Sequence, residues 1–223
     1  MLAKKILILG ATGRTAKYAI PMALVKHYKI VALVRDPEKI TFQSESLTVI
    51  KGLPTDIADV RKAMHDCDAV LSFLGPLSRG QAISFRKIKR PHILKKSIAN
   101  VLEVMKEYGI KRIMILSTLG AGDSWRFNPW YVKLLGRFTN FKVIFEDHTA
   151  QEKLVQNSET DWTIARAARL SDKLTSGKLI ISYHRSPKPF HISRQLLAEF
   201  FIENIYNEAY RQKAPILSEA GKN

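Results

Sequence analysis

The sequence predicts an α/β fold in which helices flank both faces of a doubly wound, mostly parallel sheet. Short apolar runs of strand length alternate along the chain with longer amphipathic segments, as repeated β–α units require. The apolar runs are rich in Ile, Val and Leu, which suits strands that are buried on both faces. No repeat of fixed period interrupts this alternation, so a solenoid is not expected.

The elements follow in order along the chain. Strands are predicted at residues 5–9, 29–34, 47–51, 69–73, 112–117, 161–165 and 179–183, and helices at 14–27, 56–65, 91–108, 147–157 and 193–211. Asp56 and Ser193 stand where an N-cap is expected, and Gly109 stands where a helix needs a left-handed residue at its end. Pro21 lies inside the first helix, where its missing N–H is expected to cause a kink.

Length and composition favour one globular domain over residues 1–223. A hydrophobic fraction of 46% and a charged fraction of 25% are ordinary for such a domain. The single cysteine, Cys67, cannot form an internal disulfide, and the scattered histidines predict no metal site. No run approaches the roughly 18 apolar residues of a membrane span. We therefore expect a cytoplasmic protein without a membrane partner, and both a monomer and a homodimer stay open.

The charge is strongly basic. Lys and Arg number 36 against 20 Asp and Glu, which gives a formal net charge of +16 and favours an anionic ligand. One acid-free segment contains Arg79, Arg86, Lys87, Lys89, Arg90, Lys95 and Lys96. A solvated basic face is its simplest interpretation, and a rim that attracts an anionic substrate is a second. Only Phe85 lies among these cations, so stacking on nucleic-acid bases has little support and nucleic acid is not expected.

A glycine-rich turn follows the first predicted strand and carries the strongest motif in the chain. The turn reads Gly10-Ala11-Thr12-Gly13-Arg14-Thr15, and a predicted helix follows it directly. Gly10 permits a tight turn, and Gly13 lets the backbone approach a pyrophosphate. The N–H groups at the helix start then face the anion. In this setting of strand, turn, helix and second strand, the motif predicts a Rossmann-type dinucleotide site.

The residue that ends the second strand indicates which dinucleotide is preferred. An acid at this position binds the ribose 2′-hydroxyl of NAD, whereas an Arg favours the 2′-phosphate of NADP. Arg35 occupies the position, and Arg14 in the glycine turn offers a second cation. Asp36 competes as an NAD-type acid, but neighbouring strand side chains point to opposite sides. The sequence therefore predicts NADP(H), with NAD(H) less favoured.

Residues 120–136 form the least regular region of the sequence. The region follows the carboxyl end of a predicted strand, where open α/β sheets bind their ligands. Two interpretations are equally open: a ligand-binding loop, or surface packing of Trp125 and Trp130. Loops near 76–96, 119–146 and 166–178 are the expected substrate side.

These motifs together resemble the atypical short-chain dehydrogenases of the NmrA-like group, and within it the biliverdin reductase B, or flavin reductase, type. The resemblance covers nearly the whole chain. Its specific marks are Lys-Lys-Ile-x-Ile-x-Gly-Ala-Thr-Gly at residues 4–13 and Leu-Val-Arg-Asp at 33–36. Weaker marks are Asp-Ala-Val at 68–70, Leu-Gly at 74–75, Asp-His at 147–148 and Ile-Ser-Arg at 192–194.

The resemblance implies roles for particular residues. The residues that would hold the cofactor phosphates are Gly10, Thr12, Gly13, Arg14, Thr15 and Arg35, and those that would line the adenosine side are Leu74 and Gly75. Ser117 and Thr118, at the end of the fifth strand, would lie beside the nicotinamide, although the family commonly has Ser at the second position. His148 would face the cofactor ribose, and the alternative is a surface or capping histidine.

Two departures from the family pattern concern the adenine and the substrate. The family usually shows Gly-Asp after the third strand, whereas this chain has Gly52-Leu53-Pro54, which leaves the adenine contacts open. After the sixth strand the biliverdin reductase type has Pro-Pro-His, whereas this chain has Ala167-Ala168-Arg169. Biliverdin is therefore not assumed as the substrate.

The chemistry expected at such a site is hydride transfer without a protein acid. No Tyr has the Lys four residues later that activates it in short-chain dehydrogenases. Flavins and quinones can take their proton from water. An NADPH-dependent reductase of a planar acceptor is therefore favoured, with Ser117 and Thr118 orienting a small-molecule acceptor and Arg169 pairing with an acidic group on it. Strand alternation makes Arg166 a weaker candidate. The alternative is a non-catalytic NADP(H)-binding redox sensor of NmrA-like type.

Overall fold

The computed structural model describes residues 4–77, 80, 81, 84, 88, 92–173 and 177–221. Within this part, the main sheet has eight strands: β1 (Lys5–Leu9), β2 (Lys29–Val34), β3 (Leu47–Lys51), β4 (Ala69–Ser72), β5 (Arg112–Thr118), β6 (Asp161–Ala167), β8 (Leu179–Ser182) and β10 (Ile216–Glu219). Their order is β3-β2-β1-β4-β5-β6-β10-β8. Every neighbouring pair is parallel except β10 and β8. The prediction of a doubly wound, mostly parallel sheet is confirmed.

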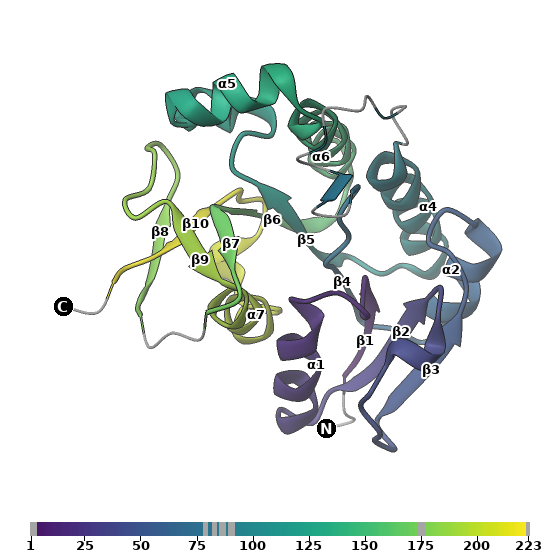
Figure 1. Cartoon of the computed structure of the whole chain (residues 1–223). Coiled ribbons are helices and arrows are strands. Elements are labelled where there is room, and N and C mark those ends of the chain that lie inside the picture. Colours follow the sequence, from purple (N-terminus) through teal and green to yellow (C-terminus); the bar gives the residue numbers. More distant parts are fainter. Residues whose placement is uncertain are drawn as a thin grey trace.

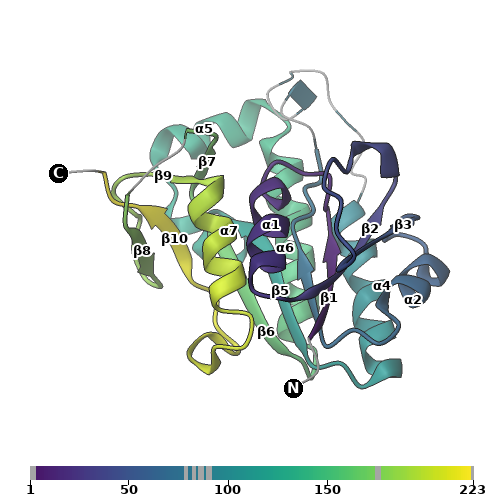
Figure 2. The same ribbon diagram turned by 90° about the horizontal axis from the view of Figure 1, so that it is seen from below.

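Helices cover both faces of this sheet (Figures 1 and 2). They are α1 (Ala16–Val25), α2 (Ile57–Met64), α4 (Ile93–Tyr108), α5 (Trp130–Phe138), α6 (Phe141–Gln156) and α7 (Arg194–Glu203). Because side chains alternate along a strand, Ile6 and Ile8 of β1 join the core with α1 and α7, while Leu7 and Leu9 join the core with α2, α4 and α6. Burial on both faces explains why the strands read as continuous apolar runs.

The strand order reverses direction between β1 and β4. The chain leaves β1 toward β2 and β3, and later returns to β4 on the other side of β1. At such a switch point the connecting helices lie on opposite faces and leave a crevice outside the carboxyl ends of the strands. The glycine turn after β1 and the segment after β4 both open at this crevice.

The predicted helix-end signals are confirmed. The side chain of Asp56 accepts a hydrogen bond from the Ala58 N–H, and that of Ser193 accepts one from the Leu196 N–H. Gly109 adopts the left-handed conformation with φ +69° at the end of α4. Helix α1 continues through Pro21.

Several elements differ from the sequence-based predictions. The region 120–136 was predicted to be irregular, but it contains a 3-10 helix (Gly122–Phe127) and most of α5. Helix α6 begins at Phe141 rather than at 147, and α7 ends at Glu203 rather than near 211. Asn204 ends α7 because its side-chain amide donates to the Phe200 carbonyl.

Three strands were not predicted. They are β10 and the paired strands β7 (Arg169–Ser171) and β9 (His191–Ser193), which form a separate two-stranded sheet. The three-residue strands β7 and β9 are too short to show an alternating pattern, so tertiary pairing defines them. Among the described residues, no helix has the length and apolar character needed to cross a bilayer.

Candidate functional site

Steric constraints at the crevice account for both glycines of the turn after β1. Gly10 has φ +73°, and a Cβ atom there would lie 2.9 Å from the backbone carbonyl of Phe73, which follows β4. A Cβ atom on Gly13 would lie 2.9 Å from the Gly10 carbonyl oxygen, which already accepts the Gly13 N–H at 2.9 Å. Glycine therefore lets the turn pack against the end of β4 and brings Gly10 beside Leu74, as the predicted site requires.

The turn leads directly into the first turn of α1. Thr15 is buried and Ala16 packs in the core, whereas Thr12 is exposed at the crevice. The N-terminus of α1 thus points its partial positive charge to the carboxyl edge of β1, an arrangement that favours an anion there.

Arg14 forms an ion pair that the sequence did not predict. Its Nη1 lies 2.8 Å from Oδ2 of Asp172, and Oδ1 of the same carboxylate lies 2.8 Å from Nη1 of Arg194 at the start of α7. Asp172 follows β7 directly. This carboxylate therefore ties the glycine turn to the segment after β6, on the expected substrate side.

A cluster of cations surrounds Asp36 at the end of β2. The Asp36 carboxylate lies 2.7 Å from Nζ of Lys39 and 3.7 Å from Nε of Arg35, whose side chain is 77% exposed. The hydrogen bond from Lys39 lowers the pKa of Asp36, and the charges of Lys39, Arg35 and Lys51 lower it further. The charges of three cations thus act on one acid at the end of β2. Sequence reasoning missed Lys39 and Lys51.

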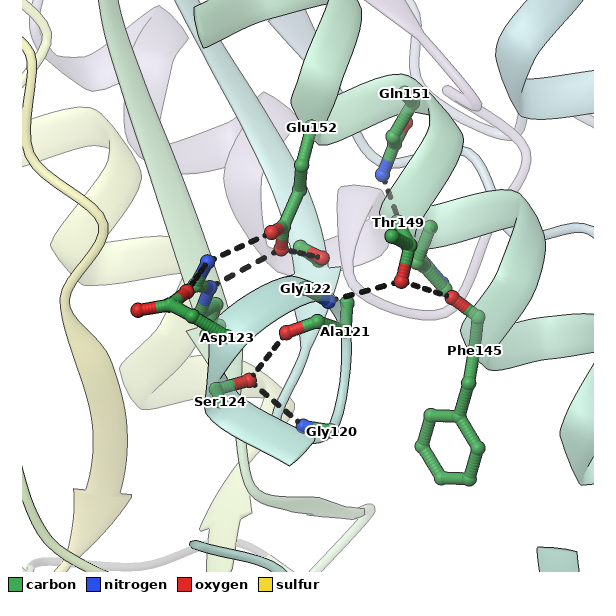
Figure 3. Close-up of polar contacts among 12 residues, drawn as sticks. Gly120, Ala121, Gly122, Asp123, Ser124, Phe145, Thr149, Gln151 and Glu152 are labelled. Atoms are coloured by element: carbon green, nitrogen blue, oxygen red, sulfur yellow. Dashed lines mark hydrogen bonds and ion pairs between the residues drawn. The ribbon is translucent and has the colours of Figure 1, made fainter. Parts of the chain in front are cut away.

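The carboxyl end of β5 carries a buried polar network (Figure 3). Ser117 Oγ donates to Oε1 of Glu152 on α6 at 2.5 Å. Arg166 on β6 donates to both oxygens of Glu152, at 3.2 and 2.8 Å. Arg166 also lies 2.6 Å from the exposed carboxylate of Asp123. The Ser117 hydroxyl is thus committed to Glu152, and Thr118 is the half-buried hydroxyl at this strand end.

The loop after β5 closes tightly over this network. Gly122 has φ +55°, and a Cβ atom there would lie 2.8 Å from Oε2 of Glu152 and 3.2 Å from Nη2 of Arg166. Its N–H donates to Oγ1 of Thr149 on α6 at 2.8 Å (Figure 3). The glycine at this position therefore allows the loop to seal the ion pair from solvent.

His148 is a buried, neutral histidine whose Nδ1 accepts a hydrogen bond. The Leu116 carbonyl can only accept, so the atom of Gln151 that faces it at 2.9 Å must be the amide nitrogen. The same nitrogen lies 2.8 Å from Nδ1 of His148, which must therefore accept. The proton of the neutral imidazole then resides on Nε2. Burial excludes the surface alternative for His148, and its neighbour Asp147 is the capping residue, because it accepts the N–H groups of residues 94 and 95 in α4.

The burial of His148 predicts a pH-dependent stability. Burial lowers the pKa of His148 from 6.5 to about 3, so the unfolded chain binds one more proton between these values. The free energy of unfolding should therefore fall by about 1.4 kcal/mol per pH unit as the pH drops from 6.5 toward 3, with no contribution above 6.5. Urea titrations at a series of pH values should show that the free energy of unfolding depends less steeply on pH in His148→Gln than in the wild type. Equal slopes in both proteins would contradict this assignment.

The remaining predicted residues lie at or near the same edge of the sheet. Arg169 is exposed on β7 and lies opposite His191 of β9. Gly75 is exposed after β4. Much of the basic segment, including Arg79, Arg86, Lys87, Lys89 and Arg90, lies outside the described residues, while Lys95 and Lys96 are exposed on α4. Burial raises the pKa of the Cys67 thiol to about 12, so this side chain is not a nucleophile.

The aromatic region after β5 packs one of its two tryptophans against α6 and leaves the other exposed. Trp125 packs edge-on against Phe145 of α6, with ring centroids 5.2 Å apart. Both rings line a cavity of about 620 Å³ between α5 and α6, together with Lys133, Lys142 and Lys153. Trp130, by contrast, does not pack into the protein and is largely exposed.

The strand order and the glycine turn at the switch point define a Rossmann-type dinucleotide-binding protein. Residues 10–208 match the family described as NAD(P)H-binding. The chain belongs to that family, and its cofactor class is a nicotinamide dinucleotide.

Relatives and solved structures agree with this assignment. An uncharacterised chloroplastic protein of Arabidopsis thaliana is 24% identical over 214 residues, which cover 92% of this chain and 73% of the relative. The structure of ChuY from Escherichia coli O157:H7, described as an anaerobillin reductase, has a TM-score of 0.80 and 22% identity, with 99% of each chain covered. A short-chain dehydrogenase/reductase from Veillonella parvula in complex with NADP has a TM-score of 0.75 and 17% identity, covering 99% of this chain and 96% of its own. These likenesses confirm the fold.

Proposed function

We propose that the protein is an NADPH-dependent reductase that transfers a hydride to a flavin, a quinone or a similar planar acceptor. The proposal rests on the polar side chains near the end of β5, which are already held by a hydrogen bond or by burial inside the protein. Ser117 donates to Glu152, and His148 is held neutral by burial. Neither group is a proton source near neutral pH, so an acceptor that takes its proton from water suits the site best.

The Tyr–Lys chemistry of alcohol dehydrogenases has no counterpart in the described structure. Tyr108 and Arg112 are the nearest match in spacing. The Tyr108 hydroxyl donates to the Arg61 carbonyl at 3.4 Å, and the Arg112 guanidinium donates to backbone carbonyls, including that of Asn204 at 3.2 Å. Both residues lie at the amino end of β5, away from the crevice.

Two groups of described residues bind different parts of the cofactor in this proposal. The glycine turn with Gly10 and Gly13 receives the pyrophosphate, and Arg35 with Lys39 and Lys51 receives the 2′-phosphate. Bound NADPH supplies the hydride. Thr118 lies where the nicotinamide is expected, and the exposed Arg169 attracts an acidic group of the acceptor.

The comparisons support this proposal. The structural neighbours include a reductase and a dehydrogenase/reductase in complex with NADP. The resemblance to the NmrA-like group, and to biliverdin reductase B within it, points to the same chemistry. The choice of a flavin, a quinone or a similar acceptor rests on one observation: neither Ser117 nor His148 can donate a proton near neutral pH.

Steady-state NADPH oxidation with FMN and with simple quinones tests the proposed activity. Turnover is expected, and kcat should be flat through neutral pH, because the pKa of His148 is about 3. A bell-shaped profile centred near pH 7 would reveal a proton donor and contradict the mechanism. Absence of turnover with every planar acceptor would refute the activity.

The same missing proton donor favours a second function, a non-catalytic sensor of the NADP pool. Both functions require that the protein binds the dinucleotide. Melting temperatures measured with NADP, NADPH, NAD and NADH test this binding independently of turnover. At a hundredfold excess over Kd, binding should add about 2.7 kcal/mol of stability. The phosphorylated pair is expected to give the larger shift. Binding without turnover, together with a partner whose affinity depends on the cofactor's oxidation state, would establish the sensor.

A further inference from the structure

Helix α5 presents large apolar side chains to solvent. Trp130, Tyr131, Leu134 and Phe138 are all exposed, Trp130 at 76%. At the helical rotation per residue, these positions fall within an arc about 100° wide. We call it the apolar arc of α5. Surface helices normally turn such an arc inward, whereas the buried side of α5 includes Gly136.

The position of α5 leaves the apolar arc accessible. Figure 1 shows α5 at the periphery of the molecule, far from β1, β2 and β3. The Tyr131 ring packs edge-on against Phe190 at 6.4 Å, which anchors α5 to the segment before β9. The apolar arc is therefore an exposed surface on a helix that packs against the rest of the protein.

The stretch of chain that contains α5 is basic. From Ser124 to Phe145 the chain has no acidic residue and four cations, which are Arg126, Lys133, Arg137 and Lys142. Lys133 is exposed on α5 itself. The whole chain carries a net charge of +16, far more than the phosphates of one dinucleotide would neutralise.

We propose that α5 docks the protein on an anionic lipid bilayer, with the apolar arc in the interfacial layer and the surrounding cations against the headgroups. Trp and Tyr prefer this layer of a membrane, and Leu and Phe partition into its apolar side. Each Lys or Arg near an anionic surface adds attraction. A helix that lies in the interface needs no spanning length. The expectation of no membrane partner rested on the lack of a span and does not bear on such a helix.

Other occupants fit the apolar arc less well. A second copy of the chain brings another net charge of +16 to the contact, and the two copies repel each other. A small molecule requires a concave site, whereas this arc protrudes. Single-stranded nucleic acid can stack on the three rings of the arc but leaves Leu134 without a base to stack on, and oligonucleotide binding is one outcome of the test below.

Co-sedimentation of the full chain with lipid vesicles tests the proposal. We expect binding to phosphatidylcholine vesicles that contain about 30 mol% phosphatidylglycerol and none to pure phosphatidylcholine, with weakening as salt rises. The triple variant Trp130→Ser, Leu134→Ser, Phe138→Ser should bind more than about tenfold more weakly. Val25→Ser is the matched control, because Val25 is 78% exposed on α1 but lies outside the arc. Its binding should be unchanged.

A charge variant tests the electrostatic part separately. Lys133→Glu should weaken binding about tenfold. Lys111→Glu changes the net charge equally, but Lys111 is exposed just before β5, at the opposite edge of the sheet. Its effect should be much smaller, and equal losses would show that only overall charge attracts the protein.

Several results would overturn the proposal. One is a lack of binding to anionic vesicles, and another is undiminished binding of the triple variant. A third is a dimer in sedimentation velocity that only the triple variant abolishes, which would assign the arc to self-association. Binding of an oligonucleotide through the arc, without vesicle binding, would assign it to nucleic acid. Melting curves confirm that each variant is folded.

Discussion

Replacing Arg166 with leucine is expected to lower the free energy of unfolding by about 3–5 kcal/mol. Glu152 is only 1% exposed, and Arg166 donates to both of its carboxylate oxygens. Without the guanidinium, a buried negative charge remains with the Ser117 hydroxyl as its hydrogen-bond donor. For a chain of this size the loss corresponds to a fall in Tm of about 10 °C. Thermal and urea unfolding measure it directly.

Control variants separate burial from charge in this prediction. Arg126→Leu removes an exposed arginine from the 3-10 helix after β5 and should change stability by less than about 0.5 kcal/mol. Asp123→Asn should cost less than about 1 kcal/mol, because Asp123 is exposed. The double variant Glu152→Leu, Arg166→Leu should recover much of the lost stability, since it leaves no buried unpaired charge. A single variant as stable as the wild type would contradict this prediction.

Strand alternation explains why the sequence analysis made Arg166 a weaker candidate than Arg169 for pairing with the acceptor. Alternation placed Arg166 away from the acceptor, which agrees with its ion pair to Glu152 on α6. The same alternation places Ser117, its register partner on β5, on that face as well. The family resemblance implies that Ser117 lies beside the nicotinamide together with Thr118. The Ser117 hydroxyl instead donates to Glu152 on α6, whereas Thr118 at the last position of β5 is half-buried and donates to the Leu119 carbonyl at 3.3 Å.

Local patterns predicted the parts of the molecule that depend on neighbours in the chain. The caps at Asp56 and Ser193 depend on contacts within a few residues, and the buried strands and the glycine turn each have a local sequence pattern; all of these elements are present in the structure. Asp172 and Arg14 are separated by 158 residues. Glu152 and Ser117 are separated by 35. Pairings of this kind leave no periodic trace in one sequence, and only the folded sheet brings the partners together.

The apolar character of α5 misled the sequence-based prediction for a different reason. Its nine residues include Trp130, Tyr131 and Phe138, which have modest helix propensity, and Gly136, which has low propensity. Together with the preceding glycines they read as an irregular loop. The helix forms because its buried side packs near α6, and its exposed side does not follow the usual rule that the apolar face points inward.

Arg35→Asp is expected to reverse the dinucleotide preference. The substitution removes a charge-assisted hydrogen bond to the 2′-phosphate and places a carboxylate beside Asp36. The Kd for NADPH should therefore rise about a hundredfold or more, whereas the Kd for NADH should change little or fall. Calorimetric titration with both dinucleotides measures the two constants under the same salt conditions, because screening weakens an exposed cation.

Variants of the residues around Arg35 test whether the cluster at the end of β2 binds the 2′-phosphate. Lys39→Ala and Lys51→Ala should each weaken NADPH binding by a smaller factor, because each removes one of three cations that share the phosphate. Asp36→Asn distinguishes the competing interpretation. If Asp36 were an NAD-type acid, the variant would lose affinity for NADH. Because Lys39 and Arg35 already engage Asp36, we expect no loss of NADH affinity. An unchanged preference in Arg35→Asp would mean that the adenosine ribose binds away from the end of β2.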